Sequence, residues 1–207
     1  TLTLFPDDAG DFITYSGAIG PRKLFGAKLS PYIARSDGAL VTAWTLLMSM
    51  ETGEPLLLCD SKRLTTERTA ATTALAVDLL SGPGARNLAI IGAGPAAEAH
   101  LRHTARLRDW RKITVCARRA ASSSDPAFSR FFDLDRRVIM SASVNEAIGD
   151  ADVVLLCTSS AVPVLDLARL ERPALITSIS TNAPRAHEID PAALSGLDVF
   201  CDYRATA

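Results

Sequence analysis

The stretch of sequence that decides the fold is Asn87-Leu-Ala-Ile-Ile-Gly92-Ala-Gly-Pro-Ala-Ala97. An apolar strand pattern runs into a G-x-G-x-x-A turn, and a helix pattern follows directly. In such a turn the first glycine permits a tight bend, the second lets a pyrophosphate approach the backbone, and the small third residue packs helix against strand. The amides and positive dipole of the helix N-terminus favour the anion. We therefore expect a dinucleotide site here, with a purely structural turn as the alternative.

From residue 88 onward, short apolar runs alternate with stretches that favour helix. The expected strands are 88–91, 113–116, 138–140, 153–157, 175–178 and 199–201, and the expected helices are 96–108, 126–132, 144–148 and 191–194. Continuous apolar strands joined by helices are typical of a parallel sheet covered on both faces. The sequence thus predicts a doubly wound α/β domain of about six strands.

The first 87 residues follow a different pattern. Strands are expected at 12–15, 24–29, 40–50 and 56–59, with turns at Ser36-Asp-Gly38 and Glu51-Thr-Gly-Glu-Pro55, the second a hairpin signal. A long Ala-rich helix over 65–80 ends at the break Ser81-Gly-Pro-Gly84. We place the domain boundary there, with a smaller α+β domain over residues 1–82 and the doubly wound domain over 83–207.

The charge balance argues against polyanionic partners. The 207 residues include 22 Lys and Arg against 23 Asp and Glu, a net charge of −1. That leaves no electrostatic excess to hold nucleic acid or an anionic membrane. No apolar run approaches the roughly 20 residues that cross a bilayer, and the N-terminus lacks a signal-peptide pattern. A cytoplasmic protein acting on a small molecule is expected.

Metal and thiol chemistry also have little support in the sequence. The cysteines at positions 59, 116, 157 and 201 form no CxxC pair, and each lies in an apolar, strand-like context, so we expect small buried side chains. His100 and His103 have no third ligand nearby and are expected at the surface. His187, beside Glu188, is interpreted as part of a polar loop, with a proton relay as the alternative. No metal site is predicted.

The end of the second expected strand bears on which dinucleotide is bound. NAD selectivity usually needs an acid there for the ribose 2′-hydroxyl, but this strand continues Val115-Cys-Ala-Arg118-Arg119-Ala-Ala-Ser-Ser. Two guanidinium groups can instead donate to a 2′-phosphate, which favours NADPH over NADH. A solvated loop is the alternative for Arg118 and Arg119.

A hydroxyl-rich loop, Cys157-Thr-Ser-Ser-Ala-Val-Pro163, follows the fourth expected strand of this domain. Open α/β sheets bind ligands at this carboxyl edge, so Thr158 and Ser159 could line the nicotinamide side of the cofactor. They could equally satisfy turn amides, the commoner role of such hydroxyls.

Three motifs stand in order along the chain: Gly26-Ala-Lys28; Thr65-Thr-Glu-Arg-Thr-Ala-Ala71 leading to Ile90-Ile-Gly-Ala-Gly94; and Ile179-Ser-Thr-Asn-Ala-Pro-Arg-Ala-His-Glu188. The chain thereby resembles the ornithine cyclodeaminase/μ-crystallin family, whose mark is an L-T-x-x-R-T-A-A helix running into a Rossmann domain. The resemblance covers essentially the whole chain. It implies that residues 1–82 form a substrate and dimerisation domain, so a homodimer is expected. Family members are usually longer than 300 residues, so the chain is expected to be incomplete at both ends.

The resemblance also implies residue roles. Lys28 matches the family's substrate-contacting lysine, and Arg68 matches an arginine that reaches the cofactor phosphates. Cofactor-contacting positions fall on Gly92, Gly94, Pro95, Ala96 and Thr158. Asn182 stands where the ornithine-deaminating members carry a catalytic aspartate. An amide cannot act as a general base, which disfavours deamination with ring closure.

These implications favour an NADPH-dependent reductase of cyclic imino acids, a ketimine reductase forming a proline- or pipecolate-like amino acid. The cofactor would supply the hydride, Lys28 would anchor the carboxylate or keep the imine protonated, and Asn182 would border the ring. The alternatives are an ornithine cyclodeaminase that uses NAD⁺ and a non-catalytic dinucleotide- or small-ligand-binding protein.

Overall fold

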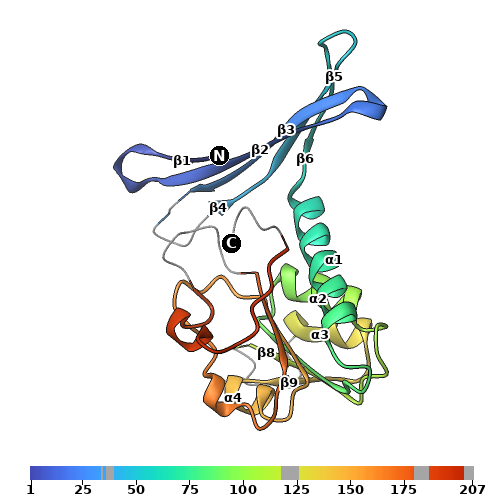
Figure 1. Cartoon of the computed structure of the whole chain (residues 1–207), viewed down its shortest axis with the longest axis vertical. Coiled ribbons are helices and arrows are strands. Elements are labelled where there is room, and N and C mark those ends of the chain that lie inside the picture. The colour runs from blue at the N-terminus through green and yellow to red at the C-terminus, as the bar shows by residue number, and fades with distance from the viewer. Residues whose placement is uncertain (34, 36–39, 118–125, 180–186, 203–207) are drawn as a thin grey trace. The chain divides into compact units, whose positions relative to one another are not determined.

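A computed structural model describes residues 1–33, 35, 40–117, 126–179 and 187–202. The chain divides into two compact units, Thr1–Thr66 and Glu67–Ala207 (Figure 1). The division falls inside a helix, upstream of the Gly/Pro break at which the sequence places the domain boundary. The assignment of 1–82 and 83–207 to separate functional domains stays a prediction.

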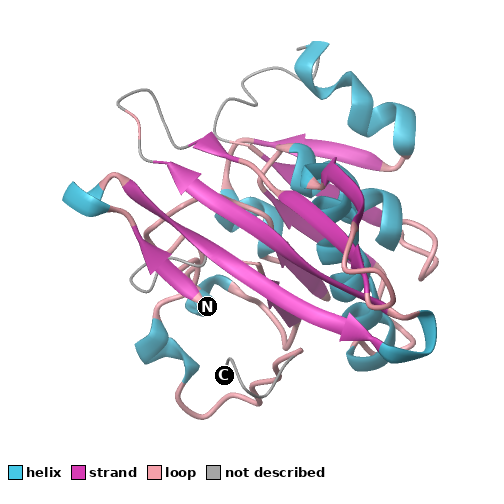
Figure 2. Cartoon of the chain, turned by 90° about the horizontal axis from the view of Figure 1, so that it is seen from above, coloured by secondary structure: helices cyan, strands magenta, loops and turns pink. Residues whose placement is uncertain are grey.

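The first unit is an antiparallel sheet, visible as long magenta arrows in Figure 2. Its strands lie in the order β1-β2-β3-β5-β6, with β4 beside β3. Their bounds are β1 Leu2–Leu4, β2 Gly10–Ile19, β3 Leu24–Ile33, β4 Leu40–Val41, β5 Trp44–Ser49 and β6 Pro55–Asp60, with 3-10 turns at Pro6–Asp8 and Gly20–Arg22. The hairpin expected around residues 51–55 is confirmed. The single strand expected over 40–50 is wrong, because Thr42 and Ala43 interrupt it; the turn at 36–38 lies outside the described residues.

Strand register distinguishes the two faces of this sheet, and both carry exposed apolar side chains, with Leu4, Tyr32 and Leu57 among those on the face of Lys28. Cross-strand partners share a face, and successive residues alternate between faces. Lys28 pairs with Tyr15 and Thr45 on one face. The opposite face, which we term the Leu58 face, carries the exposed side chains of Phe25, Leu29, Trp44, Leu46 and Leu58.

Helix α1 (Lys62–Leu80) links the two units. Its start is fixed by Asp60, whose Oδ1 accepts a hydrogen bond from the backbone N–H of Lys62 at 2.7 Å. Its buried residues are Ala70, Thr73, Ala74 and Val77, an i, i+3, i+4, i+7 stripe. This stripe explains why an Ala- and Thr-rich segment forms a helix that packs on one side only.

The second unit is built on a parallel sheet of order β11-β10-β7-β8-β9. The strands are β7 Asn87–Ile91, β8 Lys112–Cys116, β9 Val138–Ser141, β10 Val153–Leu156 and β11 Leu175–Ser178. The helices are α2 Pro95–Thr104, α3 Pro126–Leu134 and α4 Val144–Ile148, with 3-10 turns at Leu167–Arg169 and Pro191–Leu194. Counted along the chain from β7, the strand order is 3-2-1-4-5, that of a Rossmann-like fold.

Helices cover both faces of this sheet, as the predicted doubly wound fold requires (Figure 1). Leu88 and Ile90 of β7 pack into a core cluster that contains Leu101 of α2 and Phe131 of α3. The alternate residues of β7 pack into a second cluster, which contains Ile148 of α4. Every residue of β7 is therefore buried, which explains why the strand reads as a continuous apolar run.

The sixth strand, expected over 199–201, is wrong. Val199 and Phe200 are about two-thirds exposed, at 66% and 67%, and within the described residues no strand pairs with this segment. A β-favouring run forms a strand only where a neighbour completes its hydrogen bonds. Cys201 is consequently exposed rather than buried, and Cys59 is half-buried.

None of the helices in the described part of the chain combines the length and the apolar character needed to cross a bilayer.

Candidate functional site

The strand order reverses between β7 and β10, which lie side by side although β8 and β9 separate them in sequence. In open α/β sheets this switch point, at the carboxyl ends of the strands, forms the ligand crevice. The glycine-rich turn follows β7 and the Thr158 loop follows β10. The sheet thus brings these two predicted segments to one edge.

Gly92 occupies a position that a larger residue could not. Its φ is +116°, a conformation that residues with a side chain rarely adopt, and its N–H donates to the carbonyl of Cys116 at 2.8 Å. A Cβ atom at this position would lie 2.5 Å from the carbonyl oxygen of Cys157. The first glycine of the motif therefore permits close contact between the turn and the end of β10.

The remainder of the turn fits a phosphate group. Gly94 caps α2 with extended backbone, and a Cβ added to it would meet no atom within 4 Å. Pro95 begins the helix, while Ala97 is fully buried in the core. The N-terminal amides of α2, including that of Ala96, are not used by the helix itself and are available for an anion.

Thr158 is half-buried, whereas Ser159 is exposed. Both the backbone N–H and the hydroxyl of Thr158 donate to Glu188 Oε1, each at 2.8 Å. The hydroxyl oxygen also accepts from the N–H of Ser160 at 3.2 Å. The hydroxyls thus partly serve the loop itself, as the alternative interpretation of the sequence allowed.

Two polar residues at this edge were given no role by the sequence analysis. Glu188 is 1% exposed and accepts three hydrogen bonds, from the two Thr158 donors and from Ser178 Oγ at 2.7 Å. Arg130 of α3 donates from Nη2 to the carbonyl of Ala93 in the glycine turn at 2.6 Å. No local pattern predicts these contacts, because Thr158 lies 30 residues from Glu188 and Ala93 lies 37 residues from Arg130.

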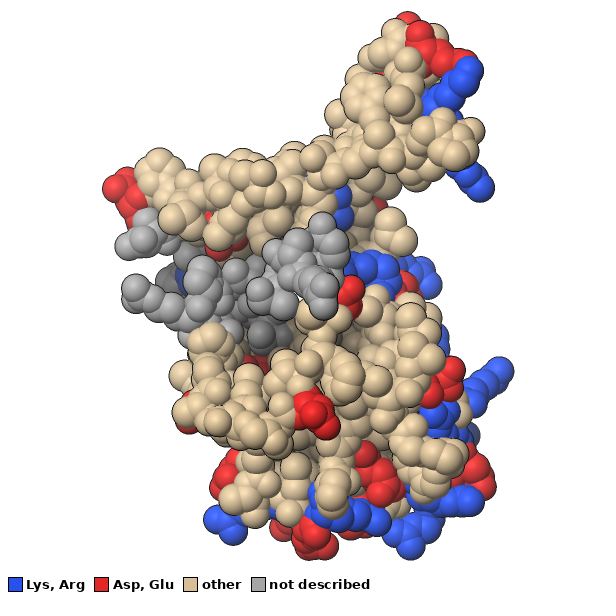
Figure 3. Space-filling view, in the orientation of Figure 1, with Lys and Arg blue, Asp and Glu red and all other residues tan. Residues whose placement is uncertain are grey.

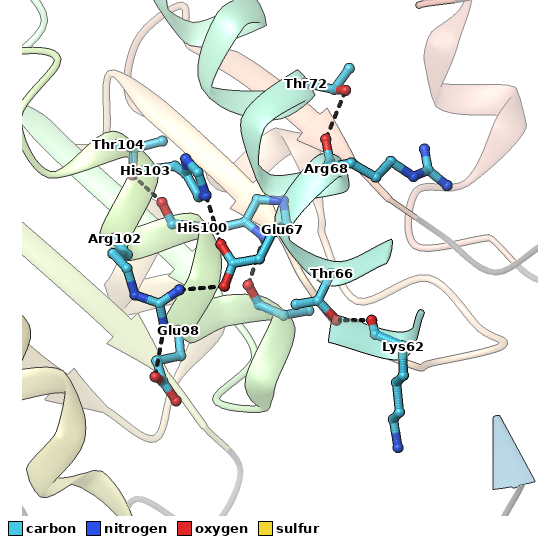
Figure 4. Close-up of polar contacts among 11 residues, drawn as sticks. Lys62, Thr66, Glu67, Arg68, Thr72, Glu98, His100, Arg102, His103 and Thr104 are labelled. Atoms are coloured by element: carbon cyan, nitrogen blue, oxygen red, sulfur yellow. Dashed lines mark hydrogen bonds and ion pairs between the residues drawn. The ribbon is translucent and has the colours of Figure 1, made fainter. Parts of the chain in front are cut away.

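Arg68 lies on the exposed side of α1, in the second unit. Figure 4 shows its side chain pointing away from Glu67, its neighbour in sequence. The Glu67 carboxylate instead accepts from Arg102 Nη1 at 2.7 Å and His103 Nε2 at 2.8 Å, joining α1 to α2. The hydrogen bond from His103 and the nearby Arg102 charge lower the pKa of Glu67.

The expectation that His100 lies at the surface is wrong. Its side chain is fully buried, with Nδ1 2.7 Å from the carbonyl of Ala96 and Nε2 3.0 Å from Thr73 Oγ1. Because a carbonyl can only accept, Nδ1 carries the proton and Nε2 accepts from Thr73. Burial lowers the pKa of His100. The residue is a neutral connector between α1 and α2.

Lys28 belongs to the first unit. Its Nζ lies 5.1 Å from the ring centroid of Tyr15, its partner across the sheet. That distance is within the range of a cation–π contact. Arg118, Arg119 and Asn182, the other predicted site residues, lie outside the described residues.

Cys116 and Cys157 match the expectation of small buried side chains. Burial raises the pKa of Cys116 to about 11 and raises that of Cys157 further, so both remain thiols at neutral pH. Within the described residues, no group of three His, Cys, Asp or Glu side chains could hold a metal ion.

The fold, with its glycine turn at the switch point, defines a Rossmann-like protein. A model of the ornithine cyclodeaminase/mu-crystallin family matches residues 28–207, and the chain belongs to this family.

Two curated relatives and one solved structure illustrate the range of the family. The chain is 53% identical to an NAD(P)H-dependent anabolic L-arginine dehydrogenase of Pseudomonas aeruginosa, over 99% of its own length and 64% of the relative. It is 30% identical to a Delta(1)-pyrroline-2-carboxylate reductase of Colwellia psychrerythraea, over 76% of this chain and 50% of the relative. An archaeal alanine dehydrogenase dimer with bound NAD shares the fold, with a TM-score of 0.79 and 24% identity over 94% of this chain and 60% of that one.

Proposed function

We propose that this chain binds NAD(P)H as part of an enzyme that interconverts an α-amino acid and its imine. The glycine turn carries the proposal, because Gly92 closes it against β10 while the space in front of Gly94 is open. When bound, the nicotinamide supplies a hydride to the carbon of the C=N bond. The whole reaction is a proposal, since the chain spans only 64% of the arginine dehydrogenase and 50% of the pyrroline-2-carboxylate reductase.

The fold and the family together support the following assignment of cofactor-binding residues. The backbone at Gly92, Gly94 and Ala96 holds the pyrophosphate beside the N-terminus of α2, where Pro95 sets the first turn. Arg68 adds a cation for the phosphates. Thr158 and Ser159 border the nicotinamide half. Arg118 and Arg119 hold a 2′-phosphate, which makes NADPH the preferred cofactor.

Substrate binding falls to Lys28 and Asn182. The Lys28 ammonium pairs with the substrate carboxylate or keeps the imine nitrogen protonated, which makes the carbon that receives the hydride more electrophilic. Asn182 borders the reacting carbon without acting as a base. Loss of ammonia with ring closure, the ornithine cyclodeaminase reaction, is disfavoured for that reason.

Two substrate classes compete. The cyclic imino acid expected from the sequence finds support in the 30% identity to a Delta(1)-pyrroline-2-carboxylate reductase. The 53% identity to an L-arginine dehydrogenase, over nearly the whole chain, favours arginine and its open-chain imine. We therefore propose L-arginine and its open-chain imine as the first candidate substrates, and the cyclic imino acid as the second.

The test begins with binding and continues with turnover. NADPH and NADH are titrated against the wild type and Gly94→Ala, following nicotinamide fluorescence. We expect the added methyl group to weaken both cofactors about tenfold, since it occupies the space the phosphate needs. Oxidation of L-arginine with NADP⁺ is then compared with reduction of Δ1-pyrroline-2-carboxylate, with L-ornithine and NAD⁺ as the cyclodeaminase control. Cofactor binding without any turnover would favour the non-catalytic alternative, and absence of binding would refute the proposal.

A further inference from the structure

Glu188 is a buried carboxylate at the ligand-binding edge of the sheet, and the proposed chemistry does not yet use it. A buried charge is unfavourable unless hydrogen bonds replace its hydration. Here both oxygens are engaged, Oε1 by Thr158 and Oε2 by Ser178. The residue therefore ties the loop after β10 to the end of β11.

The backbone around Glu188 is also anchored. Its carbonyl accepts from the N–H of Val164 at 2.9 Å, and the next residue, Ile189, forms a parallel bridge with Leu165. Glu188 is thus held both through its carboxylate and through its backbone. Thr158 follows Cys157, whose carbonyl lies close to Gly92, so Glu188 holds a residue next to the glycine turn without contacting the turn itself.

The hydrogen-bond inventory of Thr158 limits what its side chain can recognise. A hydroxyl has one donor hydrogen and two acceptor lone pairs. The hydrogen is directed at Glu188 Oε1, and one lone pair accepts from the N–H of Ser160. The hydroxyl can therefore only accept from a ligand, which makes it suited to an N–H donor.

We propose that Glu188 is a positioning residue for the nicotinamide half of the cofactor. By holding the Thr158 hydrogen, it leaves an oxygen lone pair to accept from the carboxamide N–H of the nicotinamide. The adenine half and the phosphates do not depend on it. The inference rests on the proposed function, which supplies the dinucleotide.

The experiment separates the two halves of the ligand. Dissociation constants are measured calorimetrically for NADPH and for 2′-phospho-ADP-ribose, which lacks the nicotinamide. Glu188→Ala should weaken NADPH about 5- to 30-fold, as expected for a lost buried hydrogen bond, and change 2′-phospho-ADP-ribose less than about twofold. Glu188→Gln should recover affinity to within about threefold of wild type, because its amide oxygen can accept both Thr158 donors.

Two further variants guard against a trivial loss of structure. Thr158→Val keeps the side-chain shape and should reproduce the selective loss, even if Glu188→Ala folds poorly. Asp152→Ala is the matched control, because Asp152 Oδ2 accepts from the N–H groups of Arg86 and Asn87, at 2.7 and 2.8 Å, next to the amino end of β7. It should lower the melting temperature and leave both affinities unchanged.

The possible results distinguish this inference from the proposed function. A loss confined to NADPH in Glu188→Ala and Thr158→Val supports it. Equal losses of affinity for NADPH and 2′-phospho-ADP-ribose would make Glu188 a purely structural residue. Unchanged affinity for both ligands would show that Glu188 does not contribute to the site. Each of these two results would overturn the inference. If the wild type binds neither ligand, the proposed function fails first and this inference with it.

Discussion

A Cβ atom on Gly92 would lie 2.5 Å from the carbonyl oxygen of Cys157, far inside van der Waals contact. Gly92→Ala should therefore lower the free energy of unfolding by about 1–3 kcal/mol, through this clash and through the positive φ of the residue. Gly94→Ala is the matched control, since its new methyl group meets nothing within 4 Å. Urea unfolding of both variants checks this, and equal stability of the two would contradict it.

The second prediction concerns His100 and acid stability. Because burial lowers its pKa in the folded state, the unfolded chain, with a pKa near 6.5, binds the proton first as the pH falls. The contribution of His100 to stability is therefore fully present above pH 6.5 and is lost as the pH falls through the folded-state pKa. His100→Gln cannot take up this proton and should show a shallower decline between pH 7 and 5. The denaturant midpoints of the wild type and the variant, measured across that pH range, test this prediction. If the two midpoints fell in parallel with pH, the burial-lowered pKa of His100 would not be the cause of the decline.

His100 also shows why the sequence predicts the fold better than the site. The strand β11 matches its expected bounds, and β7 to β10 match within one residue, because buried parallel strands leave continuous apolar runs. The burial of His100 depends on Thr73, 27 residues away, which satisfies its ring nitrogen. Glu188 depends likewise on Thr158 and Ser178. Local patterns carry no information about such distant partners.

The same limit explains the overpredicted strands. Val199 and Phe200 have the composition of a strand, and Thr42 and Ala43 lie inside the expected strand 40–50, but neither pair of residues belongs to a strand. Composition predicts that a segment can be extended, but hydrogen bonds to a neighbouring strand decide whether it is. The glycine turn could be predicted because its constraint is local: the positive φ of Gly92 needs a residue without a side chain.

The third prediction concerns the Leu58 face of the first unit. Figure 3 shows few charged side chains along the middle of this unit on the side in view. Large exposed apolar patches mark association sites. We propose that a second copy of the chain covers the face that contains Leu58. Leu58 is 68% exposed on this face, whereas Leu57 is 46% exposed on the opposite face. Leu58→Glu should raise the dimer dissociation constant about tenfold or more, and Leu57→Glu should not. Light scattering after gel filtration measures this, and a monomeric wild type would refute the proposal.

The fourth prediction concerns cofactor choice. If Arg118 and Arg119 hold a 2′-phosphate, replacing both by Ser should weaken NADPH by about 1.5–3 kcal/mol for each lost charge-assisted contact. NADH lacks that phosphate and should bind the variant almost as it binds the wild type. Fluorescence titrations with both cofactors provide the comparison. Equal losses would show that the two arginines do not select the cofactor.

The last prediction concerns Lys28, which lies on the face of the antiparallel sheet opposite the Leu58 face. Lys28→Met keeps the length of the side chain and removes its charge and every donor. If the ammonium pairs with the substrate carboxylate or protonates the imine, kcat/KM should fall by roughly two to four decades, the usual contribution of a positioned proton donor or electrostatic group. NADPH affinity should survive, because the phosphates are assigned to the turn at Gly92 and Gly94. Both quantities are measured on the same preparation, with L-arginine and Δ1-pyrroline-2-carboxylate as alternative substrates. Turnover close to wild type would make Lys28 an ordinary surface residue, whereas a parallel loss of NADPH binding would assign it to the cofactor instead.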